Sequence, residues 1–190
     1  MKIIRIKTVE KMDRPAVDLI PDSAIQKSGK PFFVPDFAET FRYKITTAIH
    51  ICRLGKNIAS KFASRYYNEA GLCISSEAIP TIADLKASGA PWSLATAFDG
   101  AVILGDFRPV EECQLGKSEI KLNVNGKTTE SLTTPSAKDF DELIAYVSRF
   151  FTLKIGDYLL IDGGEWHTMN INDKITAYLG ELESVNLKIK

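Results

Sequence analysis

The stretch from residue 136 to residue 164 has the clearest local pattern in this sequence. Ser136 and Asp139 stand at capping-box spacing, so their side chains can satisfy free N–H groups at the start of a helix. The apolar residues that follow recur at i, i+3, i+4 and i+7, which places them on one helical face; they are Phe140, Leu143, Ile144 and Val147. Gly156-Asp157 signals a turn before the apolar run of residues 158–161. The stretch predicts a helix, a tight turn and a buried strand. Its closing Gly163-Gly164 pair either lies at the rim of a pocket or only closes a loop.

Residues 41–53 predict the clearest strand of the chain, because polar and apolar side chains alternate along them. One face of this strand is apolar and is expected to pack on the core; it carries Phe41, Tyr43, Ile45, Ile49 and Ile51. The other face is polar and carries Arg42, Lys44, Thr46, His50 and Cys52. The polar face lines either solvent or a pocket.

The remaining segments predict a mixed α+β domain with about two main helices. The expected elements are a first edge strand at Ile4 and Ile6, a connector over 11–21, a helix over 57–70 ended by Gly71, one or two helical turns over 78–88, a strand at 101–104, a hairpin over 120–132 around Asn125-Gly126, and closing strands at 175–179 and 185–189. We divide the chain into an N-terminal edge strand and connector (1–21) and one domain (22–190).

Charge and cysteine content restrict the class of partner and the compartment. The chain has 24 Lys and Arg residues against 24 Asp and Glu residues, so its formal net charge is zero. This balance argues against nucleic-acid partners and against an anionic membrane surface. No apolar run approaches the roughly 20 residues that span a bilayer, and the first residues lack a signal-peptide pattern. The three cysteines, Cys52, Cys73 and Cys113, are scattered, which favours free thiols in the cytoplasm.

The residues alone indicate little chemistry. No phosphate-binding glycine motif or nucleophile elbow is present. Asp162, Glu165 and His167 cluster after the strand at 158–161 and form either a cation site or an ordinary polar loop. Cys52 and His50 have no third orienting group that would make them a nucleophilic pair.

Several sequence segments, taken together, resemble the fumarylacetoacetate hydrolase family. They are Pro21-Asp22-Ser23-Ala24, KPFFVPDF at 30–37, the strand at 41–53 followed by LGKNI, RYYNEAGLCI at 65–74, PWSLATAFDGAVILGDF at 91–107, LNVNGK at 122–127 and FDELIAYVSRFFTLKIGDYLLIDGG at 140–164. The resemblance covers residues 22–190 in order. It implies that family's mixed β-sheet roll, a homodimer, and a pocket at the mouth of the roll.

The resemblance also implies a type of chemistry. The resemblance implies a metal-dependent enzyme that acts on small keto acids by C–C hydrolysis, decarboxylation or isomerisation. A Mg²⁺ or Mn²⁺ ion is held by a Glu-x-Glu pair on one strand and an Asp on the next, because hard carboxylate oxygens bind such ions and the ion polarises the substrate carbonyls.

This chain departs from the family at each of these positions. Lys44-Ile45-Thr46 stands for the Glu-x-Glu pair, and Ser75 stands for the metal-binding Asp. The family's Lys before Phe-Asp is Thr96 here, although Phe98-Asp99-Gly100 is kept, and its GTP turn is matched by Asp162-Gly163-Gly164. The family's N-terminal Asn-Tyr-x-x-His stretch is absent. A second unit charge 4 Å from Lys44 would interact with it by about 4 kcal/mol at an effective dielectric of 20, so Lys44 would repel a divalent ion. We therefore expect no metal cofactor.

Two hypotheses from different functional classes follow. In the first, the chain is a non-catalytic family member that pairs with itself or with an active relative, and Arg42, Lys44 and His50 bind a small anion. In the second, it is an enzyme with an altered, metal-free site built from Lys44, Thr46, Ser75, Thr96 and Asp99, with His50 nearby. A metal enzyme that recruits Asp162, Glu165 or His167 as replacement ligands is the third and least favoured reading.

Overall fold

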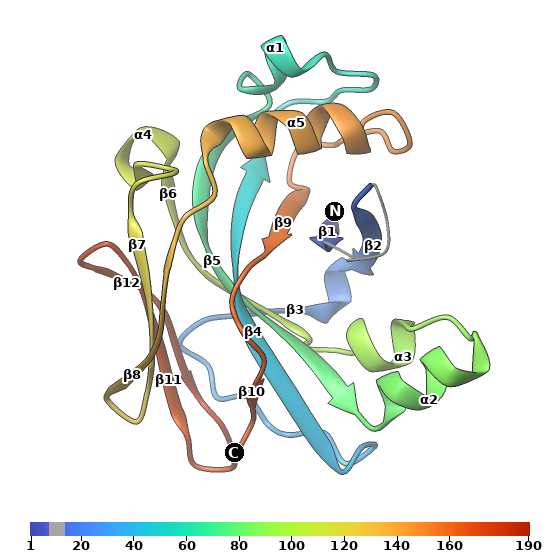
Figure 1. Ribbon diagram of the computed structural model, residues 1–190, viewed down its shortest axis with the longest axis vertical. Coiled ribbons are helices and arrows are strands. Elements are labelled where there is room, and N and C mark those ends of the chain that lie inside the picture. The colour runs from blue at the N-terminus through green and yellow to red at the C-terminus, as the bar shows by residue number, and fades with distance from the viewer. Residues whose placement is uncertain (8–13) are drawn as a thin grey trace.

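Two curved β-sheets form the frame of the computed structural model, which describes residues 1–7 and 14–190 (Figure 1). The larger sheet has the strand order β2-β1-β9-β4-β5-β6-β3, and β10 pairs with β4. The smaller sheet has the order β12-β11-β7-β8. Their bounds are β1 (Lys2–Lys7), β2 (Ala16–Pro21), β3 (Ile25–Lys27), β4 (Thr40–Ile51), β5 (Tyr67–Ile79), β6 (Val102–Pro109), β7 (Glu119–Val124), β8 (Lys127–Thr133), β9 (Tyr158–Asp162), β10 (His167–Thr168), β11 (Lys174–Leu179) and β12 (Leu182–Lys188).

The helices are short and lie outside the sheets. They are α1 (Ser60–Ala63), α2 (Thr81–Ser88), α3 (Ser93–Thr96), α4 (Val110–Cys113) and α5 (Ala137–Val147), with a 3₁₀ turn at Asp22–Ala24. Helix α5 crosses one end of the roll beneath α1, whereas α2 and α3 lie at the far end of β5 (Figure 1). The mixed α+β class, with α2 and α5 as the longest helices among the described residues, is confirmed. None of these helices is long and apolar enough to cross a bilayer.

The main core fills the space between the two sheets and under α5. It joins Tyr43, Ile45 and Ile49 of β4 to the inward side chains of the smaller sheet and to Phe140, Ile144 and Val147 of α5. The opposite face of the larger sheet covers a smaller apolar cluster around Ala48, Cys73 and Leu160. Beside this second cluster lies the polar part of the face, where the candidate site is found.

The predicted helix–turn–strand at residues 136–164 is confirmed. Ser136 Oγ accepts a hydrogen bond from the Asp139 backbone N–H at 3.2 Å, and Asp139 Oδ2 accepts one from the Ser136 N–H at 2.8 Å, which completes the capping box. Strand β9 then runs between β1 and β4, buried inside the larger sheet. The hairpin around Asn125-Gly126 and the two closing strands are also confirmed, as β7–β8 and β11–β12.

The helix predicted over residues 57–70 is wrong. Only Ser60–Ala63 is helical, and β5 already begins at Tyr67. Both faces of β5 are buried over most of its length, so the strand shows no polar–apolar alternation and its apolar residues gave a misleading helical spacing. Gly71, predicted as a helix stop, lies within β5, where an added Cβ would be 2.8 Å from the Asp106 carbonyl oxygen.

The N-terminal strand is not at an edge of the sheet, as predicted, but inside it. Strand β1 pairs with β2 on one side and, in parallel, with β9 on the other. The predicted connector contains β2, which pairs along the whole of β1; residues 11–13 of that connector lie outside the described part of the chain. The sequence could not indicate this arrangement because β9, the second partner of β1, lies some 155 residues away in the chain.

Candidate functional site

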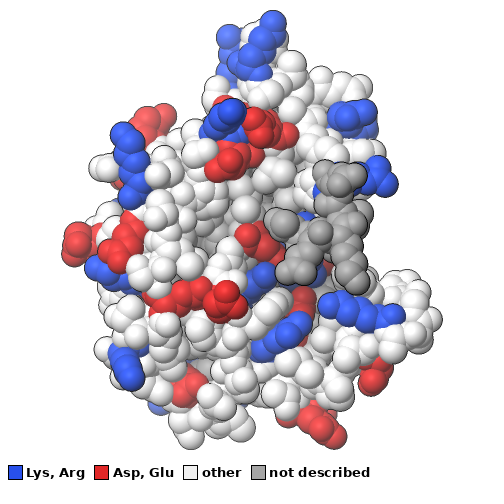
Figure 2. Space-filling view, in the orientation of Figure 1, with Lys and Arg blue, Asp and Glu red and all other residues white. Residues whose placement is uncertain are grey.

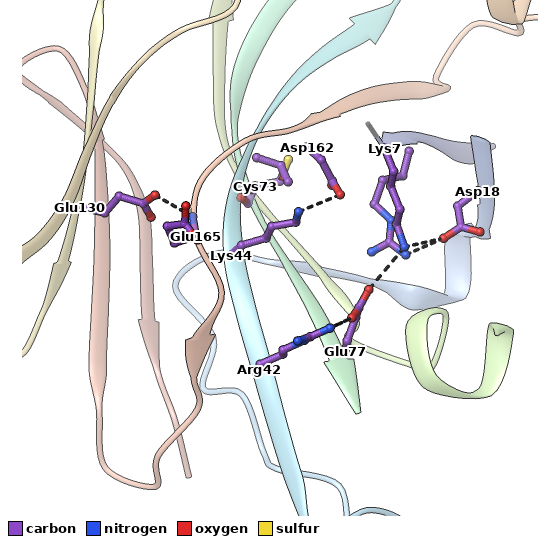
Figure 3. Close-up of polar contacts among 11 residues, drawn as sticks. Lys7, Asp18, Arg42, Lys44, Cys73, Glu77, Glu130, Asp162 and Glu165 are labelled. Carbon is purple, nitrogen blue, oxygen red and sulfur yellow. Dashed lines mark hydrogen bonds and ion pairs between the residues drawn. The ribbon is translucent and has the colours of Figure 1, made fainter. Parts of the chain in front are cut away.

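Lys44, Thr46 and Ser75, the residues predicted at the family's metal-ligand positions, meet on one face of the larger sheet. Lys44 on β4 lies directly opposite Ser75 on β5, and Thr46 lies opposite Cys73 on one side and Asp162 of β9 on the other. Residues opposite each other in antiparallel strands project to the same face. Lys44, Thr46 and Ser75 therefore share one face of the sheet, and the face also presents Asp162 (Figure 3).

Lys44 and Asp162 form a largely buried ion pair. The Lys44 ammonium nitrogen lies 2.9 Å from Asp162 Oδ2, and the two side chains are 12% and 9% exposed. The indole ring of Trp166 covers the ammonium, with Lys44 Nζ 4.6 Å from the ring centroid. Ser75 Oγ and Asp162 Oδ1 are buried and have no hydrogen-bond partner within the described residues. Two polar atoms beside the ion pair are thus left for a ligand or a water molecule.

A second row of charges continues the face toward β1 and β2. Glu77 accepts hydrogen bonds from Arg42 at 2.9 Å and from Lys7 at 3.3 Å, and Asp18 accepts from Arg5 at 2.8 Å and lies 3.1 Å from Lys7. Figure 3 shows this chain of contacts running from Arg42 to Asp18. Burial alone would raise the pKa of Glu77 and of Asp18, but the adjacent cations outweigh it and hold both pKa values below the ordinary range. Both carboxylates are therefore ionised at neutral pH.

A small cavity opens over this face. It has a volume of about 250 Å³ and is lined by Lys7, Arg42, Lys44, Glu77, Lys86, Trp92, Asp162 and Trp166. Each indole lies against two cations: Trp166 against Lys44 and Arg42, and Trp92 against Lys7 and Lys86. Among the described residues, four cations and two carboxylates line the cavity, so this lining carries a net positive charge. A cavity of this size and charge suits a small anion.

The residues present do not fit a divalent ion. Mg²⁺ and Mn²⁺ prefer carboxylate oxygens, but Lys44, Thr46 and Ser75 present an ammonium and two hydroxyls. Thr46 Oγ1 already donates to the Cys73 carbonyl oxygen at 3.2 Å. The two carboxylates that line the cavity, Asp162 and Glu77, are each paired with a cation. Within residues 1–7 and 14–190, no three acidic, His or Cys side chains gather as a metal site.

The turn after β9 places Trp166 over the ion pair. Gly164 has a φ of +64°, and an added Cβ would lie 2.9 Å from Ile45 Cγ2. Glu130 of β8 holds the segment, because its two carboxylate oxygens meet the Glu165 N–H at 2.7 Å and His167 Nε2 at 3.0 Å. Gly163 and Gly164 connect Asp162 to Trp166, which both line the cavity, but neither glycine is among the lining residues.

Three other residues predicted for the site lie elsewhere. His50 contacts Glu69 at 3.0 Å and stacks near Tyr158; six residues of strand, about 20 Å, separate it from Lys44. Asp99 lines a different hollow with Ser23 and Lys30. Thr96 is buried and its hydroxyl donates to the Trp92 carbonyl oxygen at 3.2 Å, so it touches the cavity only through its neighbour.

The structure does not bring together the alternative ligand set of Asp162, Glu165 and His167. Asp162 lies opposite Thr46, on the face that also carries Lys44, whereas His167 pairs with Tyr43, whose side chain projects from the opposite face of β4. Glu165 is exposed, and its backbone, not its carboxylate, contacts Glu130.

Several residues of the site were not found from the sequence. Lys7, Glu77, Lys86, Trp92 and Trp166 line the cavity, and Glu130 positions the turn. The polar face of β4 was the one local signal that pointed to the cavity. The other residues come from strands and loops whose pairing partners are distant in the chain, and no motif marks them.

Comparison with known proteins places the chain in one family. The family described as Fumarylacetoacetate (FAA) hydrolase C-terminal matches residues 4–181. Oxaloacetate tautomerase FAHD1, mitochondrial, of Mus musculus is 25% identical over 182 residues, which cover 94% of this chain and 82% of that protein. Oxaloacetate tautomerase YcgM of Escherichia coli is 26% identical over 151 residues, covering 78% of this chain and 69% of that protein.

Solved structures agree on the fold. A fumarylacetoacetate hydrolase family protein from Yersinia pestis superposes with a TM-score of 0.88 at 25% identity, covering 100% of this chain and 92% of that one. A fumarylpyruvate hydrolase from Pseudomonas aeruginosa, solved in complex with Mn²⁺ and pyruvate, superposes with a TM-score of 0.82 at 18% identity, covering 100% and 90%. The second likeness concerns the fold alone.

Proposed function

Because the chain belongs to the fumarylacetoacetate hydrolase family, we propose that it binds a small keto or dicarboxylic acid anion in the cavity between Trp92 and Trp166 without a divalent ion. Lys44 supplies the positive charge that the metal supplies in the family pattern. In this reading the protein has lost the metal-dependent reaction and serves as a binding or assembly subunit.

The ion pair between Lys44 and Asp162 carries this proposal. The ammonium lies on the strand face that holds the family's ligands, and the carboxylate at 2.9 Å fixes it there. A divalent ion at this position would be repelled by Lys44 and would have to displace it from Asp162. An anionic ligand faces no such barrier, because Arg42, Lys7 and Lys86 add positive charge around the same cavity.

The names of the relatives support the ligand class. Two of them are named oxaloacetate tautomerases, and one structural neighbour was solved with pyruvate. Each of these ligands is a small carboxylic acid with a ketone. A cavity of about 250 Å³ with a positive lining accommodates such a molecule.

Calorimetric titration with EDTA present tests the proposal. Oxalate and oxaloacetate should bind the purified chain, and acetate should bind more weakly because it carries one charge. The variants Lys44→Gln and Arg42→Gln should each weaken binding about tenfold or more, as expected when a charged hydrogen-bonding partner is lost. His50→Gln is the matched control outside the cavity and should bind as the wild type does. Equal affinity in all four proteins, or no binding of either dianion, would contradict the proposal.

A metal-free enolisation is the second candidate, favoured by the unpartnered Oδ1 of Asp162. In this reaction the Asp162 carboxylate removes a proton from the carbon beside the ketone, while the Lys44 ammonium hydrogen-bonds to the ketone oxygen. Return of the proton to that oxygen gives the enol, so the net reaction is an isomerisation. Ketonisation of oxaloacetate enol, measured with EDTA, should then be lost in Asp162→Asn and Lys44→Ala. Wild-type turnover no faster than buffer contradicts this candidate and leaves the binding role.

We also propose that the chain works in the cytoplasm as a dimer, with itself or with an active relative. Cys52, Cys73 and Cys113 are free thiols, as expected in a reducing compartment. Light scattering of the purified chain tests the dimer: a mass near 42 kDa, twice the 21.1 kDa of the chain, supports self-association, and a mass of one chain contradicts it.

A further inference from the structure

Two chain segments meet at the end of the molecule that carries α1. They are residues 53–65, which include α1, and residues 149–155, which follow α5 (Figure 1). Gly55 and Leu153 exchange both backbone hydrogen bonds, at 3.0 and 2.8 Å. The Lys56 ammonium donates to the Phe150 carbonyl oxygen at 2.8 Å, which ties the two segments a second time. We call the surface they form the α1 surface.

The α1 surface is strongly basic. Its two segments contain six cations and no acidic residue: Arg53, Lys56, Lys61, Arg65, Arg149 and Lys154. All six are exposed, and within the described part of the chain none forms an ion pair with a carboxylate. Figure 2 shows Lys and Arg side chains over α1 at the top of the molecule, with the acidic side chains of the view below it. The zero net charge of the chain therefore conceals a local excess of positive charge.

Large apolar side chains stand exposed among these cations. Leu54 is 62% exposed, Phe62 41%, Phe150 51% and Ile155 69%. Phe62 lies beneath two of the cations, with Lys61 and Arg65 about 5 Å from its ring centroid. A single exposed apolar residue is ordinary, but four of them on one basic surface are characteristic of an interaction site.

We propose that the α1 surface docks on the surface of an anionic lipid bilayer. The six cations attract acidic headgroups, and Leu54, Phe62, Phe150 and Ile155 insert at the boundary between headgroups and acyl chains. This mode needs no membrane-spanning helix. It differs from the expectation that net charge alone gives, that an anionic membrane is no partner, because membrane binding depends on the local charge and not on the total.

The composition of the surface favours lipid over other partners. A second copy of the chain on the same surface would bring twelve cations together with no acidic residue between them, which like-charge repulsion disfavours. Nucleic acids would pair with the cations and stack on Phe62 or Phe150, but they offer nothing for the aliphatic Leu54 and Ile155. A bilayer uses all ten side chains.

Docking in this way leaves the cavity free. His50 lies near the end of β4 that leads to the α1 surface, and about 20 Å of strand separates it from Lys44. Ligand binding and membrane binding can therefore be measured independently, and the failure of one has no bearing on the other.

Co-sedimentation of the full chain with vesicles tests the proposal. Vesicles of phosphatidylcholine with 30% phosphatidylglycerol should bind the protein at low salt, whereas pure phosphatidylcholine should not. Each cation near an anionic surface contributes about a factor of five in affinity, so Lys61→Glu/Arg65→Glu should reduce partitioning at least ~25-fold. The control Lys27→Glu/Lys30→Glu makes the same charge change outside the α1 surface and should bind like the wild type.

A third variant isolates the apolar contribution. Leu54→Ser/Ile155→Ser keeps every cation and should still bind several-fold more weakly, because two apolar side chains no longer insert. Absence of wild-type binding to the anionic vesicles overturns the proposal, as does equal loss in the control variant. Binding to heparin or to a DNA oligonucleotide but not to vesicles overturns it in favour of a different polyanion.

Discussion

The Lys44 ammonium and the Asp162 carboxylate face each other across β4 and β9, 2.9 Å apart, on the surface where the sequence resemblance predicts the family's metal site. Both residues differ from what the resemblance to the family predicts. Lys44 stands at a carboxylate position, and Asp162 stands in the segment that matches the family's GTP turn. An unpaired ammonium at this depth would be costly, and Asp162 removes that cost. The pair explains how a lysine side chain can be largely buried on this face of the sheet.

Removing one member of this pair should destabilise the protein more than removing both. Asp162→Leu or Lys44→Met leaves a charge largely buried without its partner, which costs about 3 kcal/mol. The free energy of unfolding of the double variant Lys44→Met/Asp162→Leu should lie within about 1 kcal/mol of the wild-type value. Urea unfolding followed by far-UV circular dichroism gives the three values. Strict additivity of the single variants would show that the two side chains do not interact.

Acid should weaken the fold through Glu77 and Asp18. Both pKa values in the folded state lie below their ordinary values of 4.5 and 3.8, so the unfolded chain binds protons more readily than the folded one does. The stability that these carboxylates contribute is fully present above their ordinary pKa values and is lost as pH falls through the lower folded values. Urea midpoints should therefore fall steadily below about pH 4.5. Glu77→Gln should flatten this dependence, and an unchanged slope would contradict the assignment.

Glu130 should control the position of Trp166. Its carboxylate accepts a hydrogen bond from the Glu165 N–H and contacts His167. Glu130→Gln weakens both contacts and should lower the free energy of unfolding by about 1.5–3 kcal/mol. In a Trp92→Phe background the remaining fluorescence comes from Trp166 alone. Acrylamide should quench it more strongly in Glu130→Gln than in the parent. Glu183→Gln, which changes an exposed carboxylate of β12, is the control and should leave quenching unchanged.

Gly164 should tolerate no side chain. An alanine there would have a φ of +64° and a Cβ 2.9 Å from Ile45 and 3.1 Å from the Glu130 carboxylate. The free energy of unfolding of Gly164→Ala should be about 2–3 kcal/mol lower than that of the wild type, because backbone strain and steric crowding act together. Gly126→Ala is the matched control, because its φ is +80° but nothing lies within 4 Å of the added methyl. It should lose only about 1 kcal/mol. Equal losses would mean that crowding at Gly164 is relieved by movement of the turn.

Much of the fold could be predicted because its signals are local. The capping box at Ser136, the Asn125-Gly126 turn and the alternation along β4 each lie within a few residues of the structure they specify. Strand β5 was misread because both of its faces are buried, so the alternation that marks a half-buried strand is missing. Strand β1 was misplaced because its partner β9 lies at the other end of the chain.

The same distinction between local and distant signals applies to the candidate site. Lys44, Thr46 and Ser75 could be placed together because they occupy aligned positions on two adjacent strands. Asp162 was noted as a member of a polar cluster, but its pairing with Lys44 depends on β9 lying beside β4, which no local pattern shows. Trp92, Lys86 and Lys7 reach the cavity from a loop, a helix and a strand that only the tertiary fold brings together.

Titration with Mn²⁺ tests the central claim, that Lys44 takes the place of the divalent ion. Free Mn²⁺ gives a strong paramagnetic resonance signal that is lost on binding to a protein. The wild-type chain should leave the signal unchanged at micromolar Mn²⁺, whereas Lys44→Glu/Thr46→Glu/Ser75→Asp, which restores the family's carboxylates on the same face, should reduce it in a one-to-one ratio. Micromolar Mn²⁺ binding by the wild type that is lost in Asp162→Asn would contradict the claim, because the ion would then share the face with Lys44.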